Sequence, residues 1–127
     1  MTTHNKYAGE IKASLGGQER VFKLTFERLV HLEDATGKSV MQLSRSITEQ
    51  TFKTTDIVEI VYQGLLGAGG KFEKNAIGKM VITDGLIASA SIASNILASL
   101  FLTTDELSPL VKGENQLKTT DTQSKNT

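Results

Sequence analysis

The first regular pattern in the chain is an alternation of apolar and polar residues. Apolar or small residues occupy the odd positions of 7–15, while the even positions from Glu10 onward are polar. This period of two predicts a strand that buries one of its faces. Gly16 and Gly17 follow, and a glycine pair accepts the positive φ angles of a tight type I′ turn. The pattern therefore predicts a β-hairpin over residues 7–26.

A two-residue turn at the glycine pair also fixes which hairpin residues face each other. From the turn toward the open end, the expected facing pairs are Ala13–Arg20, Ile11–Phe22, Gly9–Leu24 and Tyr7–Phe26. Apart from the pair nearest the turn, all of these partners are apolar or small. A slip by one residue would send every side chain to the opposite face, so the hydrophobic pattern selects this register.

After Thr25 the apolar residues recur every three or four positions, which indicates helices with one buried side. A short helix from residue 26 should end at Gly37, because glycine suits the left-handed conformation that commonly terminates a helix. Ser39 and Gln42 have the spacing of a capping box, in which each side chain accepts a bond from the other residue's backbone N–H. This motif predicts the start of a second helix.

A third helix is expected to begin with Thr54 or Thr55 as its N-cap. Its apolar residues lie on almost every side and are Ile57, Val58, Ile60, Val61, Leu65 and Leu66. A helix that is apolar all round belongs in the centre of a core. We expect this helix to end in the glycine-rich run 67–70.

The glycine-rich segment has some likeness to a phosphate-binding loop. A Walker A motif, however, needs glycine where this chain has Leu65, and serine or threonine where it has Phe72. The segment also follows a predicted helix instead of a strand, so its amides would not open the helix of a βα unit. We therefore predict a helix C-cap and a turn at this place.

Two further helices complete the pattern. A weaker fourth helix covers 74–82 with Gly78 in its interior, and Asp84 is expected to cap a fifth that reaches about Leu102. The segment 85–104 has no charged residue and has the length of a membrane span. Its serine and asparagine residues gather opposite its large apolar residues, as in a helix packed on a protein core. We expect no membrane span.

Together these elements predict an α+β fold, in which an N-terminal β-hairpin precedes a mainly α-helical bundle of four to five helices. Residues 7–102 hold nearly all of the apolar residues and form the predicted single domain, with helices from about residue 26. Residues 1–6 and 103–127 hold few, so burial cannot offset the entropy of ordering them. We expect a flexible N-terminus and a disordered C-terminal tail.

The composition excludes several classes of function. The 14 Lys and Arg residues balance the 14 Asp and Glu residues, so the chain lacks the positive field of most nucleic-acid binders. Lys71, Lys74 and Lys79 come nearest to a basic cluster, but Glu73 and Asp84 dilute their charge. The absence of cysteine excludes disulfides, thiolate metal sites and thiol catalysis. We expect no nucleic-acid partner.

Histidine is the remaining route to a metal or catalytic site. His4 lies in the predicted flexible end, and His31 shares a helix face with Glu27 and Asp34. That spacing can ligate a metal, but a charged helix face in solvent has the same pattern far more often. No serine–histidine–aspartate set can be completed. We therefore predict no metal, no cofactor and no enzymatic activity.

Three local motifs follow one another in an order typical of one small family. They are Leu24-Thr25-Phe26 with Leu29, Leu32-Glu33 and Gly37; Gly64-Leu65-Leu66-Gly67-Ala68-Gly69; and Asn95-Ile96-Leu97-Ala98-Ser99-Leu100-Phe101. With the order of the predicted elements, these motifs resemble the tail-protein family of gene transfer agents and related bacteriophages. That family is classed with the tail assembly chaperones and is also labelled tail tube protein. The resemblance covers about residues 7–102 and contains no catalytic signature.

The resemblance implies a role in tail assembly. Tail assembly chaperones bind the long, apolar, helical tape-measure protein before tail-tube subunits polymerise around it. The expected partners are the tape-measure protein and tail-tube subunits, with a homo-oligomer also considered, and the expected location is the cytoplasm of the bacterial host. The alternatives are a structural subunit of the tail tube, which would stay in the virion, and a small helical adaptor or regulatory protein.

Ile87 and Leu102 are the candidate partner-binding residues. Both fall on the otherwise polar side of the last predicted helix, so packing of its apolar side would leave them exposed. A chaperone needs apolar contact surface and no active site, and exposed apolar side chains supply such surface.

Overall fold

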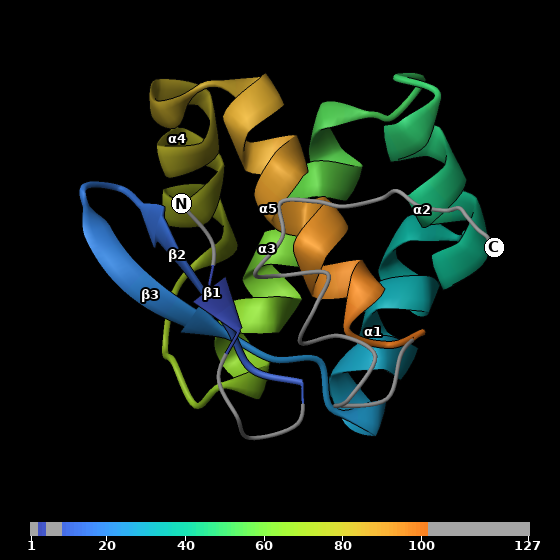
Figure 1. Cartoon of the computed structure of the whole chain (residues 1–127), viewed down its shortest axis with the longest axis horizontal. Helices are drawn as coiled ribbons and strands as arrows, with labels where there is room; N and C mark the ends of the chain where they lie inside the picture. Colours follow the sequence, from blue (N-terminus) through green and yellow to red (C-terminus); the bar gives the residue numbers. More distant parts are fainter. Residues whose placement is uncertain (1–2, 5–8, 102–127) are drawn as a thin grey trace, which may run out of the picture.

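An antiparallel sheet and five helices make up the part of the chain that the structure describes, residues 3–4 and 9–101 (Figure 1). The structure is a computed structural model. It confirms the predicted α+β class, with an N-terminal hairpin followed by helices. The predicted disordered tail, 103–127, lies outside the described residues, as does most of the predicted flexible segment 1–6.

The hairpin consists of strand β2, Ile11–Leu15, and strand β3, Gln18–Phe22, which pair in the predicted register. Ile11 faces Phe22 and Ala13 faces Arg20. Both turn glycines have positive φ angles, 65° at Gly16 and 81° at Gly17, as the turn requires. The odd-numbered residues of β2 are buried, so one face of the hairpin lies on the core.

The predicted pairing at the open end of the hairpin is wrong. The ladder ends at Ile11–Phe22, so Gly9 and Leu24 do not pair, and Phe26 is instead the 81% exposed first residue of a helix. The cause is a hydrogen bond of 2.9 Å from the Lys23 N–H to the Gly64 carbonyl, which draws the chain from the sheet to a helix. Tyr7, the predicted partner of Phe26, lies outside the described residues.

A third strand that the alternation did not indicate extends the sheet. Strand β1, Thr3–His4, pairs antiparallel with β2, so the strand order over the described residues is β1-β2-β3. Since β2 is paired on both sides, it is the central strand. A two-stranded hairpin alone is marginal in water, and this one gains from both the extra strand and the helices beneath it.

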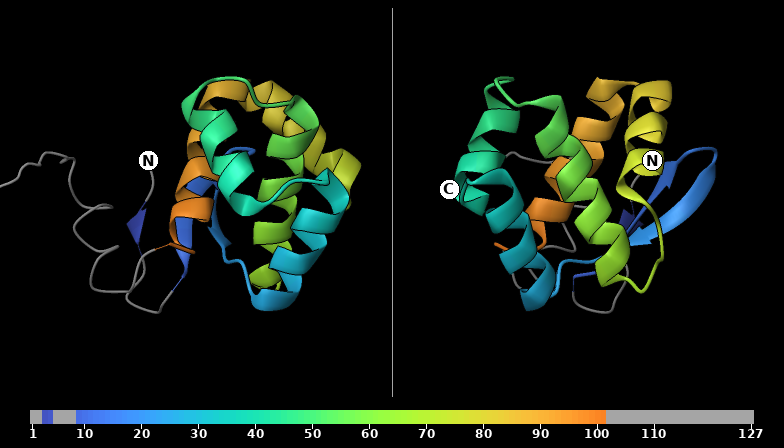
Figure 2. Two further views of the ribbon diagram at one scale, coloured as in Figure 1. Left: turned by 90° about the vertical axis from the view of Figure 1, so that its right-hand side faces the viewer. Right: turned by 180° about the vertical axis from the view of Figure 1, so that it is seen from behind.

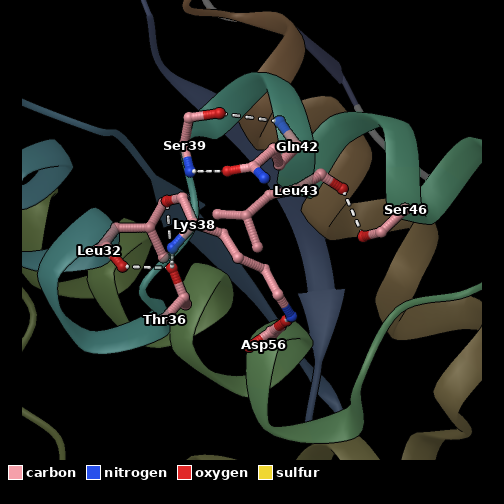
Figure 3. A network of polar contacts seen from close by, with 8 residues as sticks. All are labelled: Leu32, Thr36, Lys38, Ser39, Gln42, Leu43, Ser46 and Asp56. Atoms are coloured by element: carbon pink, nitrogen blue, oxygen red, sulfur yellow. Dashed lines mark hydrogen bonds and ion pairs between the residues drawn. The ribbon is translucent and has the colours of Figure 1, made fainter.

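The first helix begins and ends where the sequence indicates, and the second begins there. Helix α1, Phe26–Thr36, is capped by the Thr25 hydroxyl and ends at Gly37, whose φ angle is 69°. Helix α2, Val40–Thr48, begins with the predicted capping box, in which Ser39 and Gln42 exchange hydrogen bonds of 2.9 and 3.1 Å (Figure 3).

Lys38, in the short link between α1 and α2, fixes both helices to the centre of the molecule. Its ammonium group pairs with the carboxylate of Asp56, in the first turn of helix α3, Thr54–Gly67 (Figure 3). Asp56 is buried, and a carboxylate near a helix N-terminus is also favoured by the helix dipole. This interaction therefore orients the link against the start of α3.

The bounds of the last three helices differ from the prediction, although the fourth starts at Lys74 as predicted and the fifth ends at Ala98, before the expected Leu102. Helix α3 has Lys53 at its N-cap, so Thr54 is already helical and no side chain caps this end. Helix α4, Lys74–Asp84, runs two residues further than expected, and Gly85 precedes helix α5, Leu86–Ala98. The predicted cap of α5 by Asp84 is wrong, because the Asp84 carboxylate instead accepts a 2.8 Å hydrogen bond from the Gly16 N–H in the hairpin turn.

Helix α3 occupies the centre of the molecule, as its all-round apolar pattern predicts. It packs against α1, α4, α5 and β3. The sheet and α4 lie on one side of α3, while α1 and α2 lie on the other (Figures 1 and 2). Its fully buried apolar residues Ile57, Ile60 and Val61 join the core with Leu32, Leu43, Ile77, Ile96 and Leu97 from the surrounding helices.

The described residues contain no single helix with both the length and the hydrophobicity of a membrane span. Helices α4 and α5 meet those two criteria only when taken together, and their axes are bent by 119° at the break between them.

Two glycines of α3 allow the end of β3 to cross the helix at very close range. A Cβ atom at Gly67 would collide with the carbonyl oxygen of Lys23. A Cβ atom at Gly64 would lie 3.1 Å from Ile96 and 3.3 Å from Phe22. These contacts give a structural reason for both glycines in the helical part of the Gly64–Gly69 motif.

Replacement of Gly67 should therefore be far more damaging than replacement of Gly78, the glycine inside α4. We expect Gly67→Ala to lower the free energy of unfolding by about 2–4 kcal/mol, because the backbone of the strand exit must move. At Gly78 a Cβ would meet only Val58, at 3.9 Å. Gly78→Ala should thus stabilise the protein by about 0.5–1 kcal/mol through helix propensity. Urea denaturation of both variants tests this, and equal stabilities would contradict it.

Candidate partner-binding groove

A groove of about 940 Å³ lies between α3 and α4 and is open to solvent. Its volume is in the range of protein binding sites. The side chains that line it come from one face of each helix, at spacings of one, three or four residues. They are Thr55, Val58 and Glu59 on α3, and Lys74, Asn75, Gly78, Lys79, Ile82 and Thr83 on α4.

The middle of the groove is apolar and hollow. Val58 presents its side chain from α3, and Gly78 opposite has none. Because a Cβ at Gly78 would only just touch Val58, this glycine leaves space there and does not serve a tight helix contact. Ile82, one helical turn further on, is 62% exposed. An apolar group that entered the groove would contact all three residues.

A chain of polar contacts starts at Lys74 and Glu59 in the groove and leads away from it to α1. The Lys74 ammonium lies 2.7 Å from one carboxylate oxygen of the buried Glu59 and 5.3 Å from the centre of the Tyr62 ring. The other oxygen of Glu59 accepts a 2.8 Å hydrogen bond from the Gln63 amide, whose oxygen in turn accepts from Arg28 at 3.3 Å. The charge of Lys74 is thus already matched within the protein.

Lys79, in contrast, makes no ion pair with any residue of 9–101. Its side chain is exposed and lines the groove. The remaining polar lining residues, Thr55, Asn75 and Thr83, are uncharged. Once the pair of Glu59 and Lys74 is set aside, Lys79 is the one unmatched charge among the described residues that line the groove.

The predicted partner-binding residues are placed differently by the structure. Ile87 is 71% exposed, as expected, but it is not among the residues that line the groove. Leu102 lies outside the described residues. Binding of a partner by Ile87 or Leu102 remains a prediction.

No pattern along the sequence indicates the groove. Gly78 is the one signal there, because a glycine inside a helix needs a reason, but by itself it predicts only a weak point in the helix. Ile82 falls within the predicted fourth helix, but nothing in the spacing shows that α3 would leave its side uncovered. Both facts became visible only when the two helices were brought together.

Two other segments that the sequence offers as candidate sites, around His31 and in the glycine-rich run, do not form one in the described part of the chain. His31 is exposed on α1, and no three His, Asp or Glu side chains within residues 9–101 are arranged to hold a metal ion. In the glycine-rich segment the N–H groups of Gly69 and Gly70 donate to the carbonyls of Leu66 and Leu65, at 3.0 and 2.9 Å. These amides terminate α3, which confirms the predicted C-cap and turn.

The comparison with known protein families agrees with the resemblance seen in the motifs. A family model described as "Phage tail tube protein, GTA-gp10" matches residues 8–103. The chain belongs to this family of phage and gene-transfer-agent tail proteins. No curated protein and no solved structure matches the chain. The matched region covers nearly all of the described residues.

Loss of Lys74 should destabilise the protein more than loss of the nearby Lys79. Lys74→Met leaves one oxygen of the buried Glu59 without its cation, and we expect unfolding to become easier by about 1–2 kcal/mol. The cost stays modest because half of the Lys74 side chain is exposed and water screens the pair. Lys79→Met should change stability by less than about 0.5 kcal/mol. Thermal denaturation of the two variants measures the difference, and similar melting temperatures would rule out this role of Lys74.

Proposed function

We propose that the protein is a tail assembly chaperone that binds the tape-measure protein of its phage or gene transfer agent. The observation that supports this best is the open groove between α3 and α4, with Val58, Gly78 and Ile82 as its apolar part. Amphipathic helices commonly bind by laying their apolar side into such a groove. Membership of a tail-protein family supplies the context in which a helical partner is expected.

A structural subunit of the tail tube is the second candidate. The printed description of the family, which names a tail tube protein, favours it. Such a subunit would join its neighbours in a ring by adding strands to sheet edges. The paired strands β2 and β3 have only five residues each, and helices form most of the described domain. This proportion favours the chaperone over a sheet-lined tube.

The proposed role requires binding and release and no catalysis, so we propose that the protein is not an enzyme. A chaperone would act in the cytoplasm of the host cell while tails are being built. A tube subunit would instead remain in the finished virion. The two candidates therefore differ in where the protein is found after assembly.

Co-expression tests the chaperone directly. We expect the tape-measure protein to co-purify with this protein and to become more soluble in its presence, because its apolar helical surface is then covered. The control is the tape-measure protein expressed alone under the same conditions. If the two proteins never co-purify and the tape-measure protein is soluble by itself, the proposed function is wrong.

The composition of purified particles separates the two candidates. Quantitative mass spectrometry should find this protein absent or far below the copy number of the ring-forming subunits if it is a chaperone. A copy number equal to that of a tube subunit would support the tail-tube alternative instead.

A further inference from the structure

We infer that the groove between α3 and α4 takes an amphipathic helix with acidic side chains along the edge that meets Lys79. This inference rests on the proposed function in one respect, namely that the partner is a helical tail protein. It goes further by naming the surface and the charge pattern that this partner helix must have.

The shape of the groove suits a helix. Its two walls are themselves helices, and a third helix can pack its side-chain ridge between them. The hollow at Gly78 has room for the methyl-sized end of an inserted apolar side chain, because a Cβ there would touch only a methyl carbon of Val58, at 3.9 Å. Ile82 stands beside the hollow and is 62% exposed, so a docked helix would cover it. An apolar stripe on the partner would thus contact Val58, Gly78 and Ile82 together.

The charge of the groove determines which charged residues are favoured along the side of the partner helix. Lys74 is held by Glu59, whereas Lys79 has no ion pair within residues 9–101. An acidic side chain opposite Lys79 would gain an ion pair at the rim of the interface, and a basic one would meet a like charge. Pairs at a rim add little affinity but discriminate between partners, because the mismatched charge is repelled.

Two synthetic peptides provide the first test. Both are helices of equal length with the same leucine and alanine stripe, and they carry either glutamate or lysine along one flank. We expect the full-length protein to bind the glutamate peptide about five- to tenfold more tightly, as measured by fluorescence anisotropy. Equal affinities would overturn the charge assignment.

Variants of the groove provide the second test. Lys79→Glu should reverse the preference between the two peptides, because it reverses the one unmatched charge. Gly78→Met should fill the hollow, and Ile82→Asp should place a charge against the apolar stripe. Each variant should therefore bind both peptides at least tenfold more weakly than the wild type does. The matched control is Met41→Asp on α2, since Met41 has the same exposed fraction as Ile82, 62%. It should leave binding unchanged, and circular dichroism should show all four variants folded.

The same variants distinguish a failure of this inference from a failure of the proposed function. If the tape-measure protein co-purifies equally well with wild type, Gly78→Met and Ile82→Asp, the groove assignment is wrong and the chaperone role stands. If wild type discriminates the peptides but does not capture the tape-measure protein, the groove assignment stands and the chaperone role is wrong. A dimer of the free protein that Gly78→Met abolishes would overturn the inference, because a second copy would then be the occupant.

Discussion

The close crossing of β3 over the end of α3 is the constraint on which the rest of the fold depends. The Lys23 N–H bonds to the Gly64 carbonyl, and Gly67 has no side chain where the Lys23 carbonyl passes. This contact ends the hairpin at Phe22 and redirects the chain into α1, so the sheet lies on one side of α3 and α1 on the other. With both sides occupied, α3 becomes the central helix. The glycines that permit this crossing stand in the motif Gly64–Gly69, which ties the family resemblance to a physical requirement of the backbone.

The polar residues of α3 define where the surrounding elements sit on it. Asp56 binds Lys38 from the link between α1 and α2, and Glu59 binds Lys74 at the start of α4. Gln63 then connects Glu59 to Arg28 of α1. A buried acidic group is costly unless it is paired, so each of these contacts favours one placement of a neighbouring helix over others. The groove follows from this arrangement, because α4 buries Ile77 and Val81 in the core while its Gly78 and Ile82 line the groove beside α3.

Much of the local structure could be predicted from the sequence because local rules decide it. The glycine pair specifies a two-residue turn, and the hydrophobic pattern then allows only the register that joins Ile11 to Phe22. The capping box and Gly37 mark helix ends by bonds between near neighbours. Two of the errors occur where a distant residue competes. Asp84 is a residue of the kind that caps helices, and its position suits α5. Its carboxylate instead accepts a hydrogen bond from the Gly16 N–H, sixty-eight residues away in the hairpin turn. Leu24 continues the alternating pattern, yet the Gly64 carbonyl draws its neighbour Lys23 away from the sheet.

The sequence by itself determined the fold class, the hairpin register, the central helix and the family of this protein. Each of these depends on residue types at fixed spacings along the chain, which act without reference to distant partners. Only the tertiary structure decided the site. The groove exists because α3 and α4 pack side by side with Gly78, which has no side chain, facing Val58. Lys74 and Lys79 differ because Lys74 reaches Glu59 and Lys79 does not. Exposure, hollow space and unmatched charge are properties of neighbours in space, so no pattern along a single chain contains them.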